Sequence, residues 1–364
     1  MDLKNRIISK LENRKKEGTY RSLFFDQMGI DFWSNDYLSY AQFSINKNEG
    51  KIGSTGSRLI SGNSNYTENV EKEISHFFKG ESALLFNSGY DANLGLLSCL
   101  PQKNDVILYD EHIHASMRDG IRLSNAKNYG FAHNSLIDLE KKLQLNTGDD
   151  GVKFVCIESL YSMGGDLAPL LSIIQLCEKY DAYLIIDEAH SGGIYGQYGE
   201  GISATLGFEN RFFARVFTFG KAFGCHGAAV IGTNDLKNYL INFSRSFIYT
   251  TALPQNSIQH ISTSLQRNEF VELRKKLFEN IHLFRELCLK NNISSISEVN
   301  SPIQMIQIGN TQETIEKADF LRKNGFLIKA IVAPTVKQGD EAIRVCIHAH
   351  NTDKEIEHLI SLLK

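Results

Sequence analysis

Short apolar runs alternate with helix-like segments through the middle of the chain, from about residue 66 to residue 250. Each run has the length of a strand buried on both faces, and the segments between the runs show helical patterns. The runs are ALLFN (83–87), VILYD (106–110), KFVCIE (153–158), AYLIID (182–187), RVFTFG (215–220) and AAVIG (228–232). Strands that alternate with helices in this way predict a doubly wound, mainly parallel α/β sheet.

The pattern changes after Pro254. A long helical region at roughly 255–290 is followed by shorter strand-like runs and two further helical segments, which is typical of a separate α+β domain. The runs lie at 303–309, 326–332 and 342–348, and the helical segments at 311–323 and 353–363. The sequence therefore predicts an N-terminal helix and segment (1–50), a large α/β domain (51–252) and a small α+β C-terminal domain (253–364).

The first residues, MDLKNRIISKLENRKKEG, mix acidic and basic side chains. They contain neither the apolar region of a signal peptide nor an apolar span of about 18 residues. Ile7, Ile8 and Leu11 have helical spacing. We therefore expect a short amphipathic helix here, rather than a signal peptide or a membrane anchor.

The composition of the 364-residue chain disfavours several classes of partner. A hydrophobic content of 42% is enough for a sizeable core, and the formal net charge of −3 creates no basic field for nucleic acid or a membrane surface. The six cysteines are scattered singly, without a CxxC pair or the Cys/His spacing of a zinc site. We expect reduced thiols, no bound metal and a cytoplasmic protein.

One apolar run, AYLIID, ends in titratable groups. Asp187 closes the run, and His190 follows three residues later, before two glycines. In open α/β sheets, ligands bind beyond the carboxyl ends of the strands, so Asp187 lies where a ligand is expected. Taken alone, the two residues fit a helix-capping pair equally well.

Lys221 follows another strand-like run, separated from it by one glycine and flanked by apolar and small residues. Apolar surroundings disfavour the ammonium form of a lysine, which suits it to form a Schiff base. Asp187 could then pair with a protonated pyridine nitrogen, the pairing that pyridoxal phosphate needs. A single lysine after a strand is more often a solvated strand end, so this interpretation depends on the residues around it.

A phosphate site is expected where a strand leads through Ser88-Gly89-Tyr90 into a helix, because a helix N-terminus offers unpaired amide donors and a favourable dipole. The glycine-rich loop GSTGSRLISGN (53–63) is weaker evidence. His114 and His133 would by default be ordinary, partly buried histidines. The glycines at 192–201 lack the GxGxxG order of a dinucleotide loop.

The order of these features along the chain resembles the α-oxoamine synthases, a family of pyridoxal-phosphate enzymes of fold type I. The resemblance covers nearly the whole chain, and the GSTGSRLISGN loop is similar to that of the biotin-pathway members. The motifs that carry it are WSNDYLSY (33–40), GSTGSRLISGN, NSGYDAN (87–93), DEHIHAS (110–116), ESLYSMGGDLAPL (158–170), DEAHSGG (187–193), TFGKAFG (218–224) and YTTALP (249–254).

The resemblance implies a catalytic and cofactor-binding set at the strand ends. Lys221 would hold pyridoxal 5′-phosphate as a Schiff base, Asp187 would pair with the pyridinium nitrogen, and His114 would stack on the ring. His190 and Ser162 would lie on the side of the ring oxygen.

It also implies phosphate contacts and a dimer. Gly89, Tyr90 and Thr218 would lie near the cofactor phosphate of their own chain. Thr250 and Thr251 would reach the phosphate of the other subunit, so the resemblance predicts a homodimer with shared active sites.

The activity implied is a decarboxylative condensation of L-alanine with a pimeloyl thioester, carried by coenzyme A or by acyl carrier protein, in biotin biosynthesis. Arg21 and Arg344 match positions that meet substrate carboxylates, a task that suits a planar bidentate guanidinium. Asn35 and His348 are further candidates for substrate binding.

Four positions differ from the family pattern on the acyl-substrate side: Thr55, Val332, Ala333 and His348. Within the family, a 2-amino-3-oxobutyrate ligase, a 5-aminolevulinate synthase, a serine palmitoyltransferase and an autoinducer synthase remain alternatives. A non-catalytic scaffold with the same fold would not need an aldehyde-reactive lysine. A nicotinamide enzyme would need a dinucleotide fingerprint, which the sequence lacks.

Overall fold

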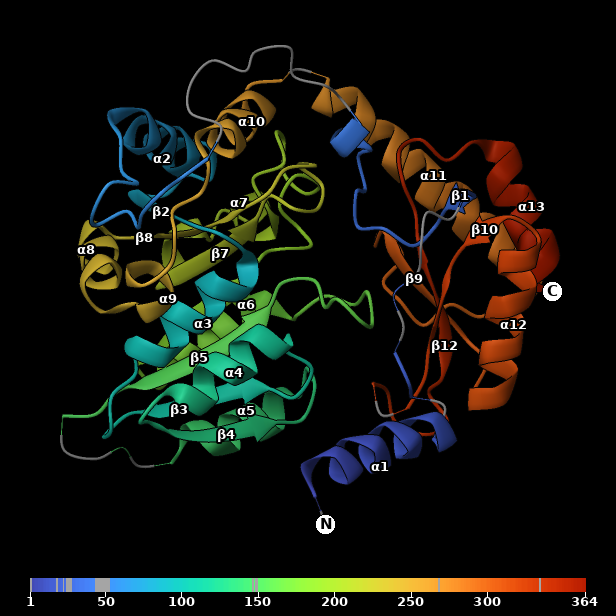
Figure 1. Cartoon of the computed structure of the whole chain (residues 1–364), viewed down its shortest axis with the longest axis horizontal. Helices are drawn as coiled ribbons and strands as arrows, with labels where there is room; N and C mark the ends of the chain where they lie inside the picture. The colour runs from blue at the N-terminus through green and yellow to red at the C-terminus, as the bar shows by residue number, and fades with distance from the viewer. Residues whose placement is uncertain are drawn as a thin grey trace. The chain divides into compact units, whose positions relative to one another are not determined.

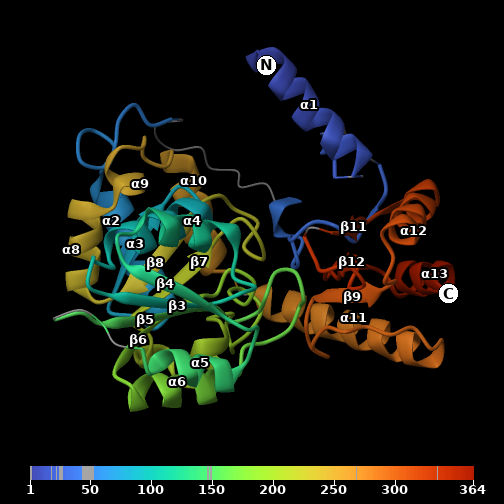
Figure 2. The ribbon, with the colours of Figure 1, turned by 90° about the horizontal axis from the view of Figure 1, so that it is seen from below.

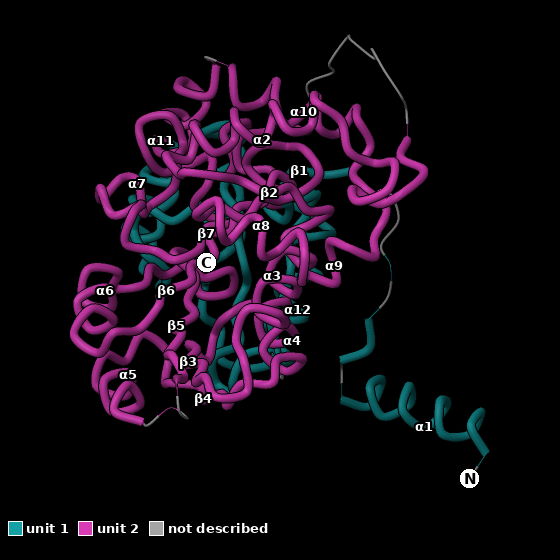
Figure 3. Tube along the Cα trace, turned by 90° about the vertical axis from the view of Figure 1, so that its left-hand side faces the viewer, with its two compact units in different colours: residues 1–34, 280–347, 351–364 teal, residues 35–279, 348–350 magenta. Residues whose placement is uncertain are grey.

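The computed structural model describes residues 2–364, except for 18, 22, 24–27, 43–52, 146, 148–149, 268 and 334. The chain divides into two compact units, coloured in Figure 3: unit 1 holds residues 1–34, 280–347 and 351–364, and unit 2 holds residues 35–279 and 348–350. These units differ from the predicted segments, since residues 253–279 group with the α/β unit. The predicted boundary at 50/51 lies outside the described residues.

Unit 2 contains a seven-stranded sheet in the order β2-β8-β7-β6-β5-β3-β4. Neighbouring strands are parallel except for β8, which runs antiparallel to β2 and β7. The six apolar runs form strands as predicted. Their bounds are β2 Ser82–Phe86, β3 Val106–Asp110, β5 Lys153–Glu158, β6 Ala182–Asp187, β7 Ala214–Thr218 and β8 Ala228–Gly232.

The pattern of apolar runs missed β4 (Lys127–Phe131), which pairs in parallel with β3. This strand, KNYGF, lies at the edge of the sheet, and only its last residue, Phe131, is fully buried. A strand at the edge of a sheet that is largely exposed to solvent does not need consecutive apolar residues. It therefore leaves no apolar run in the sequence. The pairing matters for function, since it brings the chain after Phe131 beside the end of β3.

Helices cover both faces of this sheet (Figure 1). Figure 2 shows α5 and α6 on one face and α3 and α4 on the other, as expected when parallel strands are joined by crossover helices. Several helices begin at a side chain that accepts a backbone N–H: Ser64, Ser88, Ser135 and Thr233. The helices are α2 Asn65–Phe77, α3 Gly89–Cys99, α4 Ala115–Leu123, α5 Leu136–Leu143, α6 Leu170–Lys179, α7 Ile202–Thr205, α8 Asn234–Phe243, α9 Arg245–Ile248 and α10 Gln255–Leu265.

The core of unit 2 is formed by the strands and the inner faces of these helices. Leu84, Ile107, Val155 and Ile185 are fully buried on strands of this sheet. Burying a side chain of this size contributes about 1.5–3 kcal/mol. The polar residues that follow these strands are therefore carried on a rigid frame.

Unit 1 contains a three-stranded antiparallel sheet, β11-β12-β9, and a parallel pair, β1-β10. The predicted run 326–332 is split, because β10 pairs with β1 whereas β11 pairs with β12. The predicted helices at 311–323 and 353–363 are confirmed. The elements are α1 Leu3–Lys16, β1 Ile30–Asp31, β9 Ile303–Gln307, α12 Thr311–Lys323, β10 Phe326–Leu327, β11 Lys329–Ile331, β12 Ala342–Cys346 and α13 Asp353–Leu363.

The helical region predicted at 255–290 is two helices, α10 and α11 (Phe270–Lys290), and α11 continues from unit 2 into unit 1. The amphipathic N-terminal helix is present as α1. Its apolar residues Leu3, Ile7, Ile8 and Leu11 are all exposed in the chain. No helix among the described residues is both long and apolar enough to cross a membrane.

Candidate active site

The predicted cofactor residues of unit 2 follow the carboxyl ends of parallel strands. In the sheet, Glu158 at the end of β5 pairs with Asp187 at the end of β6, and Asp187 pairs in turn with Val216 of β7. Residues that follow β2, β3, β5, β6 and β7 therefore meet at one edge of the sheet, where α/β proteins bind ligands.

Asp187 is held in place before any ligand binds. Its Oδ2 accepts a hydrogen bond from Asn93 Nδ2 at 2.6 Å, and its Oδ1 accepts one from the backbone N–H of Ala189 at 2.8 Å. The carboxyl group is buried. A buried carboxylate that accepts two hydrogen bonds is held in one orientation. A fixed carboxylate is what a cationic ring nitrogen would require here.

His114 belongs to the same hydrogen-bond network. Its Nδ1 accepts from the backbone N–H of Ser116 at 3.2 Å, so the neutral ring carries its proton on Nε2. The Ser116 hydroxyl accepts from Asn93 Nδ2 at 3.1 Å, which links His114 to Asp187. Burial lowers the pKa of His114 below its usual range; Asp187 opposes the shift, and Lys221 adds to it.

Asn93 joins the two motifs and was not singled out from the sequence. It is fully buried on α3, and its amide donates to both Asp187 and Ser116. The sequence did contain a signal for Asn93: a carboxamide side chain beside the apolar residues of NLGLL, in a helix that is buried. A buried polar side chain in such a place needs partners.

Lys221 lies on the turn after β7, and its carbonyl accepts from the backbone N–H of Gly224 at 2.8 Å. Gly224 has a φ of +59°, and a Cβ there would lie 2.3 Å from the backbone nitrogen of Ala41. The turn therefore needs glycine. The charge of Lys221 acts on the pKa values of both His114 and Glu158, which places its amine in their neighbourhood.

Glu158 is a second carboxyl group at this edge that the sequence analysis did not assign. Burial raises its pKa to about 8; the charge of Asp187 contributes to the rise, and Lys221 opposes it. Its Oε2 accepts from the backbone N–H of Ser162 at 3.2 Å, whereas its buried Oε1 has no hydrogen-bond partner among the described residues. Burial and the neighbouring Asp187 therefore disfavour the charged form of Glu158.

His190 is buried and hydrogen-bonded through Nδ1. The Tyr37 hydroxyl oxygen lies 2.7 Å from this nitrogen, although the two residues are 153 positions apart in the chain. Sequence reasoning could not foresee this contact, because it joins two segments that are distant in the sequence.

The predicted phosphate turn opens α3. Ser88 caps the helix and accepts from the backbone N–H of Asp91 at 3.1 Å, which leaves Gly89 and Tyr90 in its first turn. A Cβ at Gly89 would lie 3.5 Å from Thr218 Cβ, so the absence of a side chain keeps space between this turn and Thr218. The Tyr90 hydroxyl donates to Asp119.

Thr250 and Thr251 lie beside the residue that precedes this turn. Asn87 Nδ2 donates to Thr250 Oγ1 at 3.1 Å and to the carbonyl of Thr251 at 2.8 Å. The two threonines are thus tied to the end of β2 in their own chain. Their reach into a second subunit stays a prediction.

The four predicted substrate residues are divided between the units. Asn35 and His348 belong to unit 2, whereas Arg21 and Arg344 belong to unit 1. Arg21 is exposed; Arg344 is half-buried on β12 and donates from Nη1 to Cys346 Sγ at 2.9 Å. Their contact with a substrate stays a prediction.

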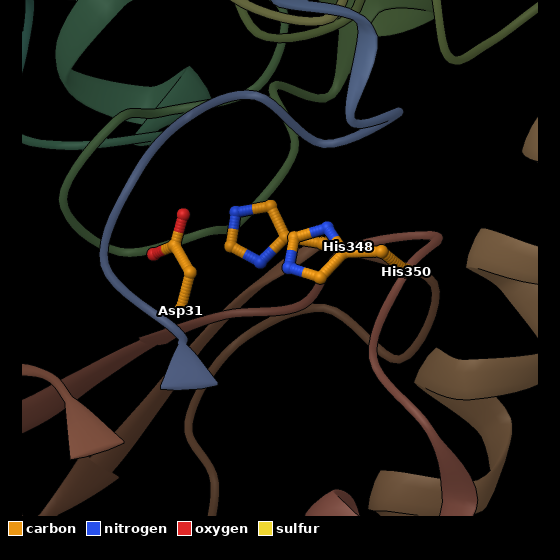
Figure 4. Close-up of side chains that lie close together, drawn as sticks. All are labelled: Asp31, His348 and His350. Carbon is orange, nitrogen blue, oxygen red and sulfur yellow. The ribbon is translucent and has the colours of Figure 1, made fainter. Parts of the chain in front are cut away.

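The positions that differ from the family pattern are placed as follows. Thr55 is exposed, and Val332 and Ala333 are half-buried after β11. His348 is fully buried, and its ring stacks on that of His350 with centroids 4.9 Å apart (Figure 4).

His133 is more than an ordinary, partly buried histidine. Its Nδ1 lies 2.9 Å from Asp110 Oδ1, and its Nε2 lies 2.7 Å from Asp166 Oδ2. Burial alone would lower the pKa of His133, but the hydrogen bonds to the two carboxylates outweigh it and raise the pKa to about 9. The protonated ring therefore fastens the turn that contains Asp166 and Ser162 to the end of β3.

The chain belongs to the family of class I and II aminotransferases, whose model matches residues 27–363. The 8-amino-7-oxononanoate synthase of Emericella nidulans is 39% identical over 92% of this chain and 88% of its own length. The solved 8-amino-7-oxononanoate synthase of Francisella tularensis has a TM-score of 0.77 at 32% identity, with 92% of this chain and 96% of that one covered.

A serine palmitoyltransferase variant from S. paucimobilis, solved with bound PLP and myriocin, has a TM-score of 0.90 at 25% identity, with 100% of this chain and 98% of that one covered. The predicted fold class, a fold type I transferase with a mainly parallel central sheet, is thereby confirmed.

Proposed function

We propose that this chain is a pyridoxal-phosphate-dependent acyltransferase of biotin biosynthesis. It condenses L-alanine with a pimeloyl thioester and yields 8-amino-7-oxononanoate, CO2 and the free thiol. The proposal is supported by relatives of that name at 32–39% identity over most of the chain. It is also supported by the motifs that resemble the α-oxoamine synthases.

The observation that carries the proposal is the pre-oriented Asp187, fixed by Asn93 and linked through Ser116 to His114. The residues at this edge fit pyridoxal phosphate: a buried carboxylate for a ring nitrogen, a neutral imidazole for the ring face, and an amine at Lys221. The turn at Gly89 offers backbone donors for a phosphate at the N-terminus of an 11-residue helix. When bound, this cofactor withdraws electrons from the Cα of an amino acid and makes its proton acidic.

The residues of the chain supply positioning and proton transfer. Lys221 would hold the cofactor, and its amine, once displaced by that of L-alanine, would remove the Cα proton of this substrate. A carbon–carbon bond would then form between Cα and the acyl carbon while the thioester C–S bond breaks and the leaving thiolate takes a proton. The alanine carboxylate would leave as CO2, and a proton would replace it at Cα. Asp187 keeps its orientation throughout, because Asn93 and the Ala189 N–H hold its two oxygens. Arg21 and Arg344 would bind the carboxylates of the substrates.

We further propose that the enzyme is a cytoplasmic homodimer in which Thr250 and Thr251 reach the phosphate of the second active site. Ile60 and Tyr249 are 86% and 73% exposed, which supports an apolar contact surface near these threonines. Either coenzyme A or acyl carrier protein would deliver the acyl group.

The test is a substrate panel. Purified protein loaded with pyridoxal phosphate is given L-alanine, glycine or L-serine with pimeloyl-CoA, and CO2 and free thiol are measured. The proposal predicts turnover with L-alanine and the formation of 8-amino-7-oxononanoate, identified by mass. Turnover with another amino acid, or with palmitoyl-CoA in place of the pimeloyl thioester, would move the function to a different member of the α-oxoamine synthases.

A further inference from the structure

Tyr37 connects the WSNDYLSY segment to a predicted catalytic residue. Its hydroxyl oxygen lies 2.7 Å from Nδ1 of His190, and both side chains are buried. Tyr37 itself is fully buried, so no solvent competes for this contact. The hydrogen bond is therefore a fixed feature of unit 2.

The tyrosine ring is held on its other side as well. It stacks on the ring of His348, with centroids 6.4 Å apart and planes inclined by 25°. The backbone carbonyl of Tyr37 accepts from the N–H of Ala349 at 2.8 Å. Because the backbone and the ring are both fixed, the hydroxyl has a defined position from which to orient its neighbour.

Counting protons assigns the roles in this contact. The Tyr37 hydroxyl has one proton and donates it to Asn35 Oδ1 at 3.1 Å. A carboxamide oxygen can only accept, so the proton shared at 2.7 Å must come from the imidazole. His190 then carries a proton on Nδ1, and its Nε2 is an acceptor when the ring is neutral.

We propose that Tyr37 is a positioning residue for His190: its hydroxyl accepts the Nδ1 proton, so that Nε2 of the neutral ring is an acceptor that can face the bound group. Only the identity of that group, the oxygen of a pyridoxal ring, rests on the proposed function. Asn35 acts one step further out, because it takes the hydroxyl proton that would otherwise be given to the imidazole. A histidine is commonly set in one tautomer by such an outer partner.

The tautomer can be measured without cofactor. In protein labelled with ¹⁵N-histidine, long-range ¹H–¹⁵N correlation spectra distinguish a protonated nitrogen from an unprotonated one. The His190 signals are assigned as those lost in His190→Gln. The proposal predicts a protonated Nδ1 in the cofactor-free protein, and a shift toward the Nε2-protonated form in Asn35→Leu. An Nε2-protonated ring in the unmodified protein would overturn the proposal.

The consequence for activity is tested with Tyr37→Phe, which keeps the ring stacked on His348 and removes only the hydroxyl. We expect this variant to bind pyridoxal phosphate with the same visible band, and its kcat to fall about 10- to 100-fold from misplacement of His190. The KM for L-alanine should change little. The matched control is Tyr239→Phe, since the Tyr239 hydroxyl donates to the carbonyl of Cys99 at 2.9 Å, outside this site.

Two results would contradict the positioning role: an unchanged kcat with an unchanged His190 tautomer in Tyr37→Phe, or equal losses in Tyr37→Phe and Tyr239→Phe. Failure of the proposed function is distinguishable from both. In that case the unmodified protein would show no turnover, while the spectra of the cofactor-free protein would still report the tautomer of His190.

Discussion

His114 and His133 follow neighbouring strands of one sheet, yet their surroundings drive them to opposite states. His114 lies beside the hydroxyl of Ser116 and near Lys221, and its pKa is lowered. His133 lies between two carboxylates, and its pKa is raised to about 9. The comparison teaches that the partners of a strand-end histidine, rather than its place in the fold, decide whether it is a neutral ring or a cationic clamp.

The functional consequence follows from this difference. A neutral His114 can present its ring to a cofactor and keep its Nδ1 for Ser116. A cationic His133 cannot serve as a base near pH 7, but it can hold two segments together through Asp110 and Asp166. One histidine therefore belongs to the proposed chemistry and the other to its supporting structure.

The largest expected effect comes from removing the ion pairs of His133 with Asp110 and Asp166. His133→Leu leaves the fully buried side chain of Asp110 without its charged partner. Breaking a buried pair in this way costs about 3–5 kcal/mol of the free energy of unfolding. Urea unfolding at pH 7 measures the loss. The control is His282→Leu on an exposed face of α11, where we expect a change within about 0.5 kcal/mol. Equal effects in the two variants would show that His133 holds nothing together.

The second effect is a dependence of stability on alkaline pH. The folded pKa of His133 lies above its ordinary value of 6.5, so its contribution is fully present below about pH 6.5 and is lost as the pH rises through 9. The size is about 3–4 kcal/mol, from about 1.4 kcal/mol per pKa unit. Urea midpoints between pH 6 and pH 10 measure it for the unmodified protein and for His133→Gln. In His133→Gln, this loss of stability with rising pH should be absent. If the urea midpoints of the two proteins fall in parallel with pH, the prediction is wrong.

The smallest effect has the opposite sign. Because the folded pKa of His114 lies below its ordinary value, its contribution is present above about pH 6.5 and is lost as the pH falls. In His114→Gln we expect a loss of about 1 kcal/mol at pH 7, since Nδ1 caps α4, and a weaker decline of stability toward pH 5. The same series of urea midpoints tests this. A steeper loss of stability toward pH 5 in His114→Gln would show that the pKa of His114 is raised rather than lowered.

Much of the fold could be predicted because its signals are local. The run AYLIID and the helix at 353–363 have the bounds that their apolar patterns indicate. Local patterns fail where pairing decides the structure. The edge strand β4 is polar, and the run 326–332 is divided between two partner strands. The units also differ from the predicted segments, since α10 groups with the α/β sheet rather than with the C-terminal strands.

The candidate site shows the same limit. Lys221, Asp187 and His114 could be singled out because each follows a strand-like run within a motif. Their partners could not, because Asn93, Glu158 and Tyr37 act through contacts between distant segments. His133 was assigned an ordinary place for the same reason, since its two carboxylates are 23 and 33 residues away.

The central claim is that the edge of unit 2 near Asp187 and Lys221 holds pyridoxal phosphate. The most direct measurement is a titration of the cofactor-free protein with pyridoxal phosphate, followed by visible absorbance, for the unmodified chain and for Lys221→Ala. The account predicts a saturable band of the lysine-bound cofactor that is displaced by L-alanine, and the loss of this band in Lys221→Ala while the fold persists by circular dichroism. The same band in both proteins, or none in the unmodified one, would contradict it.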